Sequence, residues 1–155
     1  APFWSQLFAL AIAPAVCEEC FFRGFLQNAL RRRTTAAVAV VTTGVLFGLF
    51  HVILRDALMY ERLLPSALMG IVLGIVFERS GSVLPGMLLH LCHNGFLVTV
   101  AYYEDTFAAW GIGVSDNQHL PITALGIALL PIIIAGVLLL RPTPPSASEE
   151  STPTG

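Results

Sequence analysis

This sequence has few charged residues for its length. Only 12% of its residues are charged, and none of them is lysine. A soluble domain carries about a quarter charged residues, so this chain lacks the polar surface that would cover a globule in water. Hydrophobic residues make up 55% of the chain, and its mean hydropathy is +0.77. The composition therefore favours a membrane protein.

Basic residues and cysteines are also scarce, and each scarcity excludes a class of protein. A net charge of −2 leaves no basic face to neutralise phosphates, so nucleic acid is not an expected partner. Cys17, Cys20 and Cys92 lie in apolar segments and are too few for a secreted disulfide framework. The C-x-x-C of Cys17 and Cys20 has no second pair, so it is a weak zinc signal, and we interpret both residues as small packing side chains.

The start of the chain lacks the features of a signal peptide. It does not begin with Met, no basic region precedes the first apolar stretch, and Ala1 already lies in a hydrophobic run. We therefore expect a C-terminal piece of a longer polypeptide, with at least one helix upstream.

Long apolar runs predict an all-α fold, a polytopic transmembrane helix bundle. A spanning helix needs about 20 apolar residues. On this criterion the chain has about five membrane segments, at residues 3–30, 36–54, 63–78, 83–103 and 121–140. Pro14 removes a backbone donor from the first segment, so we expect that segment to kink there or to divide into two helices.

Small and polar residues indicate how these segments pack and where they end. Gly44 with Gly48, and Gly70 with Gly74, are one helical turn apart, which lets helices approach closely in lipid. A longer polar connection is expected at 104–120. Residues 1–141 should form one membrane domain, followed by a disordered tail, 142–155, rich in Pro, Ser, Thr and Glu.

The arginines between the segments predict an orientation. If the cluster 31–33 is cytoplasmic, Arg79 and Arg141 are cytoplasmic too, and Arg55 and Arg62 lie outside. Because positive residues concentrate on the cytoplasmic side, this distribution favours a cytoplasmic C-terminal tail.

Ionisable and amide side chains interrupt three of the apolar segments. A charged residue in a spanning helix costs about 2.5 to 3.5 kcal/mol on insertion scales, so such residues indicate a functional site by default. They are Glu18, Glu19 and Arg23 in the first segment, His51 in the second, and His90, His93 and Asn94 in the fourth.

The first group contains a paired acid and an unpaired one. Glu19 lies four residues before Arg23, the favourable orientation for a helical ion pair. Glu18 points about 100° away and has no obvious partner. Since an unpaired buried carboxylate can accept a proton, Glu18 is the candidate general base. The alternative is a charge cluster at a helix start near the membrane surface.

The histidine-bearing segments could complete a site around Glu18. Phe47 and His51 share a helix face, although a lone His in an apolar helix is more often a packing residue. His90 and Asn94, one turn apart, can donate two hydrogen bonds to one oxygen, as stabilising an oxyanion requires when water adds to an amide carbonyl. The alternative for this pair is an interhelical polar clamp.

Together these groups resemble the CPBP family of membrane endopeptidases, also called the Abi or CAAX protease family, which includes the Ras-converting CAAX endopeptidase. Its signature reads E-E-x-x-x-R, then F-x-x-x-H, then H-x-x-x-N. This chain supplies the three motifs in order, with Glu18, Glu19 and Arg23, then Phe47 and His51, then His90 and Asn94. The resemblance spans about residues 10–100 and suggests a bacterial member in the inner (cytoplasmic) membrane.

The resemblance implies an intramembrane endopeptidase that cuts a peptide bond near the membrane surface. Glu18 and His51 would position and deprotonate the attacking water, and His90 and Asn94 would hold the oxyanion. The residues that would shape the site are Glu19, Arg23 and Phe47. The substrate would be a peptide or a membrane protein in the lipid bilayer, prenylated or not.

Two alternatives stay open. Relatives were long described as metalloproteases, and a zinc-dependent peptidase would use Glu18, His51 and His90 as ligands. We favour no metal, because a zinc site needs three or four firm ligands and the chain has no H-E-x-x-H helix. The other alternative is a non-enzymatic membrane module, such as a transporter-associated, immunity or scaffold protein.

The site residues would not lie at the same depth in the membrane if the helices were parallel and their cytoplasmic ends were level. Glu18 and His51 lie roughly 13 and 16 residues from the proposed cytoplasmic helix ends, but His90 lies only about 8 from its own. At a rise of 1.5 Å per residue, the depths differ by roughly 10 Å. The helices must therefore be tilted and staggered, or the third and fourth segments must meet below the surface.

Overall fold

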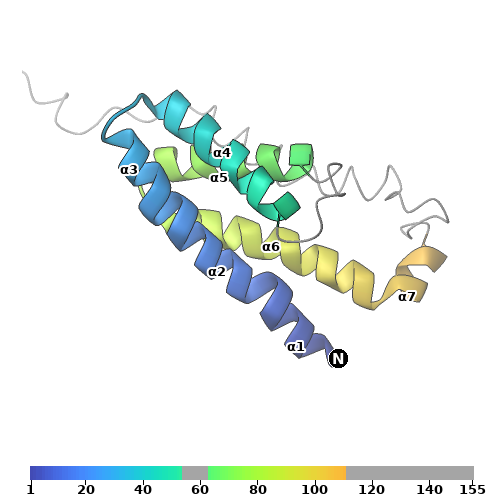
Figure 1. Ribbon diagram of the computed structural model, residues 1–155. Helices are drawn as coiled ribbons and strands as arrows, with labels where there is room; N and C mark the ends of the chain where they lie inside the picture. Colours follow the sequence, from blue (N-terminus) through green and yellow to red (C-terminus); the bar gives the residue numbers. More distant parts are fainter. Residues whose placement is uncertain (54–62, 111–155) are drawn as a thin grey trace, which may run out of the picture.

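The computed structural model describes residues 1–53 and 63–110, which form an all-α bundle without strands (Figure 1). Four helices in these ranges are long and apolar enough to cross a membrane: Phe3–Arg31, Ala36–Ile53, Leu63–Ser80 and Val83–Tyr102. They confirm the predicted fold class and the first four predicted segments. The predicted segment 121–140 and the tail 142–155 lie outside the described residues.

The first helix, Phe3–Arg31, is continuous through Pro14, so the expected division into two helices is wrong. A π-helical stretch, Phe8–Ile12, comes just before the proline, and the amide of Ala13 bonds to the carbonyl of Phe8, five residues earlier. A widened turn of this kind makes room for a proline ring, which would clash with the carbonyl four residues before it in a regular helix. The helix can therefore pass through Pro14 without ending.

The rest of the first helix alternates between α-helical and π-helical stretches. The α-helical parts are α1 (Phe3–Leu7), α2 (Ala13–Glu19) and α3 (Asn28–Arg31), and a second π-helical stretch, Cys20–Gln27, joins α2 to α3. Single π-turns inside α-helices are frequent at functional sites. This one begins directly after the pair Glu18 and Glu19.

Helices α4 (Ala36–Ile53) and α5 (Leu63–Ser80) pack backbone to backbone. A Cβ atom added at Gly70 would lie 2.9 Å from the Cα of Gly44, and one added at Gly48 would lie 2.8 Å from the carbonyl oxygen of Leu63. The predicted role of these glycines in close packing is confirmed, because neither helix leaves room for a side chain there.

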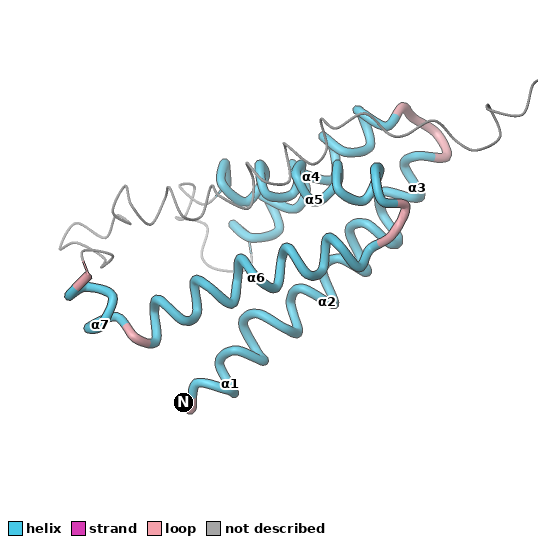
Figure 2. Tube along the Cα trace, turned by 180° about the vertical axis from the view of Figure 1, so that it is seen from behind, coloured by secondary structure: helices cyan, strands magenta, loops and turns pink. Residues whose placement is uncertain are grey.

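Helix α6 (Val83–Tyr102) runs beside the first helix and also contacts α5, as Figure 2 shows. It begins where the Ser82 hydroxyl accepts a hydrogen bond from the amide of Leu84, at 3.3 Å. A short helix, α7 (Glu104–Ala109), follows. The connection expected at 104–120 therefore includes helical residues, and the acids Glu104 and Asp105 in its first turn suit the positive end of a helix dipole.

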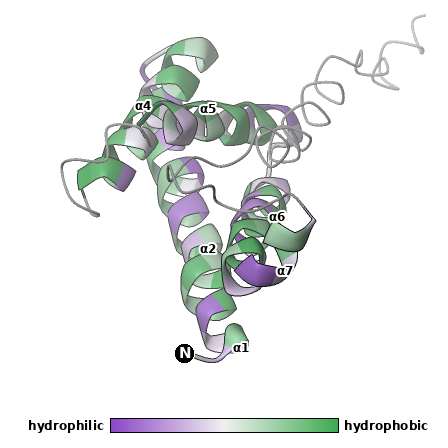
Figure 3. Cartoon of the chain, turned by 90° about the vertical axis from the view of Figure 1, so that its right-hand side faces the viewer, coloured by the Kyte–Doolittle hydropathy of each residue, from purple (hydrophilic) through white to green (hydrophobic). Residues whose placement is uncertain are grey.

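The surface of the bundle is apolar, and polar groups lie inside. Large hydrophobic side chains face outward on all the spanning helices, and Trp4 and Phe25 are 75% and 65% exposed. Hydrophobic residues predominate along these helices in Figure 3. Five polar or charged residues are buried among the described ones: Glu19, Arg23, Gln27, Thr43 and His90. This distribution suits a lipid solvent, because apolar side chains can face lipid, whereas polar groups need hydrogen-bond partners within the protein.

Candidate active site

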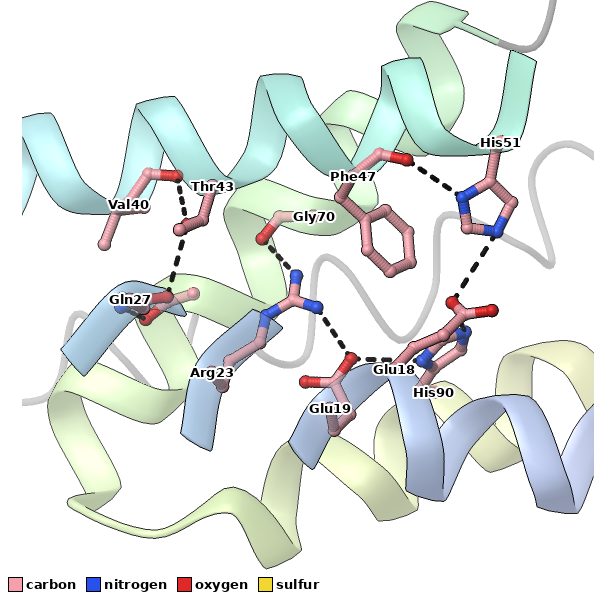
Figure 4. A network of polar contacts seen from close by, with 11 residues as sticks. Glu18, Glu19, Arg23, Gln27, Val40, Thr43, Phe47, His51, Gly70 and His90 are labelled. Atoms are coloured by element: carbon pink, nitrogen blue, oxygen red, sulfur yellow. Dashed lines mark hydrogen bonds and ion pairs between the residues drawn. The ribbon is translucent and has the colours of Figure 1, made fainter. Parts of the chain in front are cut away.

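Four of the predicted site residues, from three helices, meet within the bundle (Figure 4). Glu18 and Glu19 come from the first helix, His51 from the last turn of α4, and His90 from the middle of α6. Glu19 and His90 are buried, whereas Glu18 and His51 are partly exposed. The site therefore has an inner, enclosed part and an outer part that is partly exposed.

Arg23 and Glu19 form the predicted ion pair, and both side chains are fully buried. The Nη1 atom of Arg23 lies 2.8 Å from Oε1 of Glu19. The Nη2 atom donates to the carbonyl of Gly70 in α5, at 2.7 Å, and the guanidinium carbon lies 4.8 Å from the ring centre of Phe47 in α4. Arg23 thus joins three helices as well as neutralising Glu19.

The same Glu19 oxygen holds His90. The Nδ1 atom of His90 lies 3.1 Å from Oε1 of Glu19. Since this carboxylate is already paired with Arg23, it acts as the acceptor and Nδ1 carries the hydrogen. In the neutral imidazole, Nε2 then has a free lone pair.

His51 is oriented in the same way by its own helix. Its Nδ1 atom lies 2.9 Å from the carbonyl oxygen of Phe47, which can only accept a hydrogen bond, so Nδ1 donates. The Phe47 ring lies beside both imidazoles, with its centre 4.5 Å from that of His51 and 5.6 Å from that of His90. Phe47 therefore packs against both rings of the site.

Glu18 faces both imidazoles without bonding to either. Its Oε2 atom lies 3.7 Å from Nε2 of His51 and 3.9 Å from Nε2 of His90, distances too long for hydrogen bonds. The same oxygen is buried and has no hydrogen-bond partner among the described residues. One oxygen and two nitrogens, each able to accept a proton, thus face a common space that a small molecule such as water could bridge.

Asn94 is placed less closely than the other candidates. It lies one turn after His90 on α6 and is half-buried, and no hydrogen bond joins its side chain to another described residue. His93 is also half-buried on this helix, again without a hydrogen bond to the described part of the chain. The structure thus brings Glu18, His51 and His90 together and leaves Asn94 beside them.

A second set of polar contacts, missed by the sequence reasoning, continues from Arg23 towards one end of the bundle. Gln27 is fully buried, and its Nε2 atom donates to the carbonyl of Gly74 and to Oε1 of Glu78, both at 3.0 Å. The other Glu78 oxygen pairs with Nε of Arg31 at 3.1 Å. The Thr43 hydroxyl lies 3.4 Å from Oε1 of Gln27.

The sequence does contain a signal for these contacts, in the spacing of polar residues along the first helix. Polar residues recur there at every fourth position, so they share one helix face. The glycines and the acid that they meet on α5 have the same spacing. The two sets are Glu19, Arg23, Gln27 and Arg31 on the first helix, and Gly70, Gly74 and Glu78 on α5.

The contact between Glu19 and His90 also explains the unequal depths counted from the sequence. The two residues meet although they lie at different distances from their helix ends, so the helices are staggered. Figures 1 and 2 show them inclined to one another. Tilt and stagger, the first of the two explanations, is therefore observed in the bundle.

The fit of a metal ion can be tested from the donor atoms. Among the described residues, no group of three or more His, Cys, Asp and Glu has the arrangement of a metal site. Glu18, His51 and His90 converge, but they do not form a ready three-ligand zinc site.

Comparison with protein families gives a match over the first part of the chain. A family model described as "Type II CAAX prenyl endopeptidase Rce1-like" matches residues 1–96, more than half of the chain. The match includes all of the candidate site residues. Comparisons with curated proteins and with solved structures give no match.

Proposed function

Because the chain belongs to the Rce1-like family of type II CAAX prenyl endopeptidases, we propose that it hydrolyses a peptide bond at the membrane, with Glu18 as the general base. The family is one of proteases, and the four apolar helices make the chain an integral membrane protein. The proposed substrate is a peptide or a membrane protein.

The placement of Glu18 carries this proposal. Its Oε2 atom is buried and has no hydrogen bond to the described part of the chain, yet it lies within 4 Å of two imidazole nitrogens, and the Nδ1 atom of each of these rings is hydrogen-bonded elsewhere. A structural carboxylate in an apolar bundle would be paired, as Glu19 is. A carboxylate oxygen without a hydrogen bond, beside the free lone pair of His51, suits a group that binds water and accepts its proton.

In the proposed reaction, water lies between Glu18 and His51. The Nε2 lone pair of His51 accepts one hydrogen of the water and orients it, and Glu18 takes the other as the water oxygen attacks the carbonyl carbon. The carbon–nitrogen bond then breaks, and the proton held by Glu18 passes to the departing amine. Glu18 is thereby restored, and no other reactant is consumed.

His90 and Asn94 would stabilise the oxyanion of the tetrahedral intermediate. A protonated His90 can donate from Nε2, and the Glu19 carboxylate on Nδ1 would compensate the imidazolium charge, as the buried aspartate does behind the histidine of a serine protease. The amide of Asn94, one turn further along α6, can supply the second donor. This mechanism uses no metal ion.

Peptide cleavage in detergent tests the proposal. The assay compares wild type with Glu18→Gln and His51→Ala on a quenched fluorescent peptide library that includes prenylated and unprenylated C-terminal peptides. Glu104→Gln is the matched control, because it makes the same chemical change at an exposed acid of α7. We expect Glu18→Gln to lose activity by at least about a hundredfold with unchanged folding, and the control to stay at the wild-type rate. Cleavage by Glu18→Gln at the wild-type rate would show that another group is the base.

A chelator separates the metal-free mechanism from the zinc-dependent alternative. We expect a strong chelator to leave the wild-type rate unchanged, because no step of the proposed mechanism needs a metal. Loss of activity with chelator and its recovery with added zinc would overturn the metal-free mechanism while keeping the peptidase.

A further inference from the structure

Gly86, on α6, lies against the Glu19 carboxylate. The glycine is buried, and a Cβ atom added to it would lie 3.1 Å from Oε2 of Glu19 and 3.9 Å from its Cδ. The nearer distance is below the roughly 3.5 Å at which heavy atoms attract best. This carboxylate oxygen is buried and has no hydrogen-bond partner among the described residues. Any residue other than glycine at position 86 would therefore displace the Glu19 carboxylate from its present position.

The carboxylate has little freedom to yield. Its other oxygen is held by Arg23 at 2.8 Å and by His90 at 3.1 Å, and the Glu19 side chain is fully buried. Arg23 is itself anchored to the carbonyl of Gly70 at 2.7 Å. A side chain at position 86 would therefore press on a carboxylate that Arg23 and His90 already hold in place.

The direction of that pressure is set by α6. Gly86 and His90 are four residues apart, so they share the face of α6 that meets Glu19. If the carboxylate moves away from a new Cβ atom, it also moves away from His90. If α6 moves instead, it carries His90 with it. In both cases the hydrogen bond between Glu19 and His90 lengthens, whereas the pair with Arg23, within the first helix, is kept.

We propose that Gly86 is a positioning residue, which sets the separation of the Glu19 carboxylate from His90 and so the orientation of the imidazole towards the reacting carbonyl. This inference rests on the proposed function, because it assigns His90 a part in the reaction. It adds a residue without a functional group to the set on which turnover depends.

The test is the Gly86→Ala variant, with Gly95→Ala as the matched control on the same helix. Both changes raise helix propensity by the same amount, but among the described residues a Cβ atom at Gly95 would meet nothing closer than the Leu7 Cδ1 atom, at 3.8 Å. We expect Gly86→Ala to lower kcat by about tenfold or more with KM nearly unchanged, since a small misplacement of a catalytic group is costly. Gly95→Ala should keep both constants within about twofold of wild type.

A second background shows whether Gly86 acts through Glu19. In Glu19→Asp the shorter side chain withdraws the carboxylate from position 86, so adding Gly86→Ala should lower neither the unfolding temperature nor the remaining kcat any further. This comparison also holds if Gly86→Ala alone fails to fold, because the double variant has no clash. A further loss in the Asp background, or wild-type kcat in Gly86→Ala, would overturn the inference. Failure of the proposed function is recognised separately, by a Glu18→Gln variant that cleaves at the wild-type rate. The kinetics of the Gly86 variants do not bear on that result.

Discussion

Arg23 is the buried cation on which the inner part of the site depends. It meets Glu19, the carbonyl of Gly70 and the ring of Phe47 at once, and its side chain has no exposed surface. A planar guanidinium can serve all three partners, whereas the ammonium of lysine is a single point charge. The side chain that neutralises Glu19 is therefore also the one that holds α5 and α4 against the first helix.

Removing this cation should destabilise the fold. We expect Arg23→Met to lower the free energy of unfolding by about 3–5 kcal/mol, because Glu19 would keep a buried charge without its partner. Arg23→Lys should retain part of that stability, since it keeps the charge but cannot bond to both Glu19 and Gly70. Thermal unfolding in detergent measures the order of the three proteins. An Arg23→Met protein as stable as wild type would contradict the structural role of the ion pair.

Asn94 separates a catalytic role from a structural clamp. Because it is half-buried and has no hydrogen bond to another described residue, Asn94→Ala should leave the unfolding temperature close to that of wild type. Its kcat should fall by about a hundredfold, as when an oxyanion donor is removed. His90→Ala removes a buried hydrogen bond to Glu19 and should lower both stability and activity. If Asn94→Ala lost stability and kept its turnover, the polar-clamp interpretation would be the right one.

Sequence reasoning identified the side chains of the site better than their partners. The ion pair of Glu19 with Arg23 follows from a spacing of four within one helix. The bond from Glu19 to His90 joins two helices and depends on their stagger, which no local spacing encodes. Gln27 was missed because an uncharged amide in an apolar helix gives a weak signal by itself, although its spacing from Arg23 places it on the same face.

At the scale of helices, the glycines decide which surfaces meet. Gly44 of α4 and Gly70 of α5 lie against one another, and the carbonyl of Gly70 also accepts the bond from Arg23. Because Gly70 has no side chain, both the backbone of Gly44 and the side chain of Arg23 can approach it closely. The contact between α4 and α5 supports the helix that carries His51.

A side chain at this contact should loosen the bundle. We expect Gly70→Ala to lower the free energy of unfolding by about 1–3 kcal/mol, because the added Cβ atom would lie 2.9 Å from the backbone of Gly44. Gly24→Ala is the control, since its Cβ atom would meet no atom of residues 1–53 and 63–110 closer than 3.8 Å. Equal unfolding temperatures for the two variants would show that α4 and α5 separate at no cost.

The helix boundaries were the part of the fold most readily predicted, because apolar runs of spanning length end at turn-forming residues. The expected ends at 78 and 103 differ by one or two residues from the observed Ser80 and Tyr102, whereas the end expected at 54 lies outside the described residues. The course of the first helix at Pro14 was not predictable in this way. A π-helical stretch depends on a single shifted hydrogen bond, and it leaves no mark on the pattern of hydrophobic residues.

For the whole molecule, Arg31 and Glu78 bring the end of the first helix next to the end of α5. The pair, at 3.1 Å, places the cluster 31–33 and Arg79 at the same end of the bundle, as the orientation predicted from the sequence requires. We propose that this end faces the cytoplasm and that the membrane is the bacterial inner membrane.

Labelling of introduced cysteines can test this orientation in whole cells. With the native cysteines replaced, Arg32→Cys and Arg79→Cys should both be shielded from an impermeant thiol reagent and both react once the membrane is made permeable. Reaction of both in intact cells would reverse the orientation, and opposite behaviour of the two would contradict their placement at one end.

The contacts between the first helix and α5 also have a constant offset. Arg23 bonds to Gly70, Gln27 to Gly74 and Arg31 to Glu78, and each pair is 47 positions apart. The two helices therefore pack against one another in a single register. An extra residue between Gly70 and Gly74, within the regular helix α5, would turn everything beyond it by about 100° and undo the later two contacts together. Evolution can change the length of the chain between these helices more freely than the spacing within either.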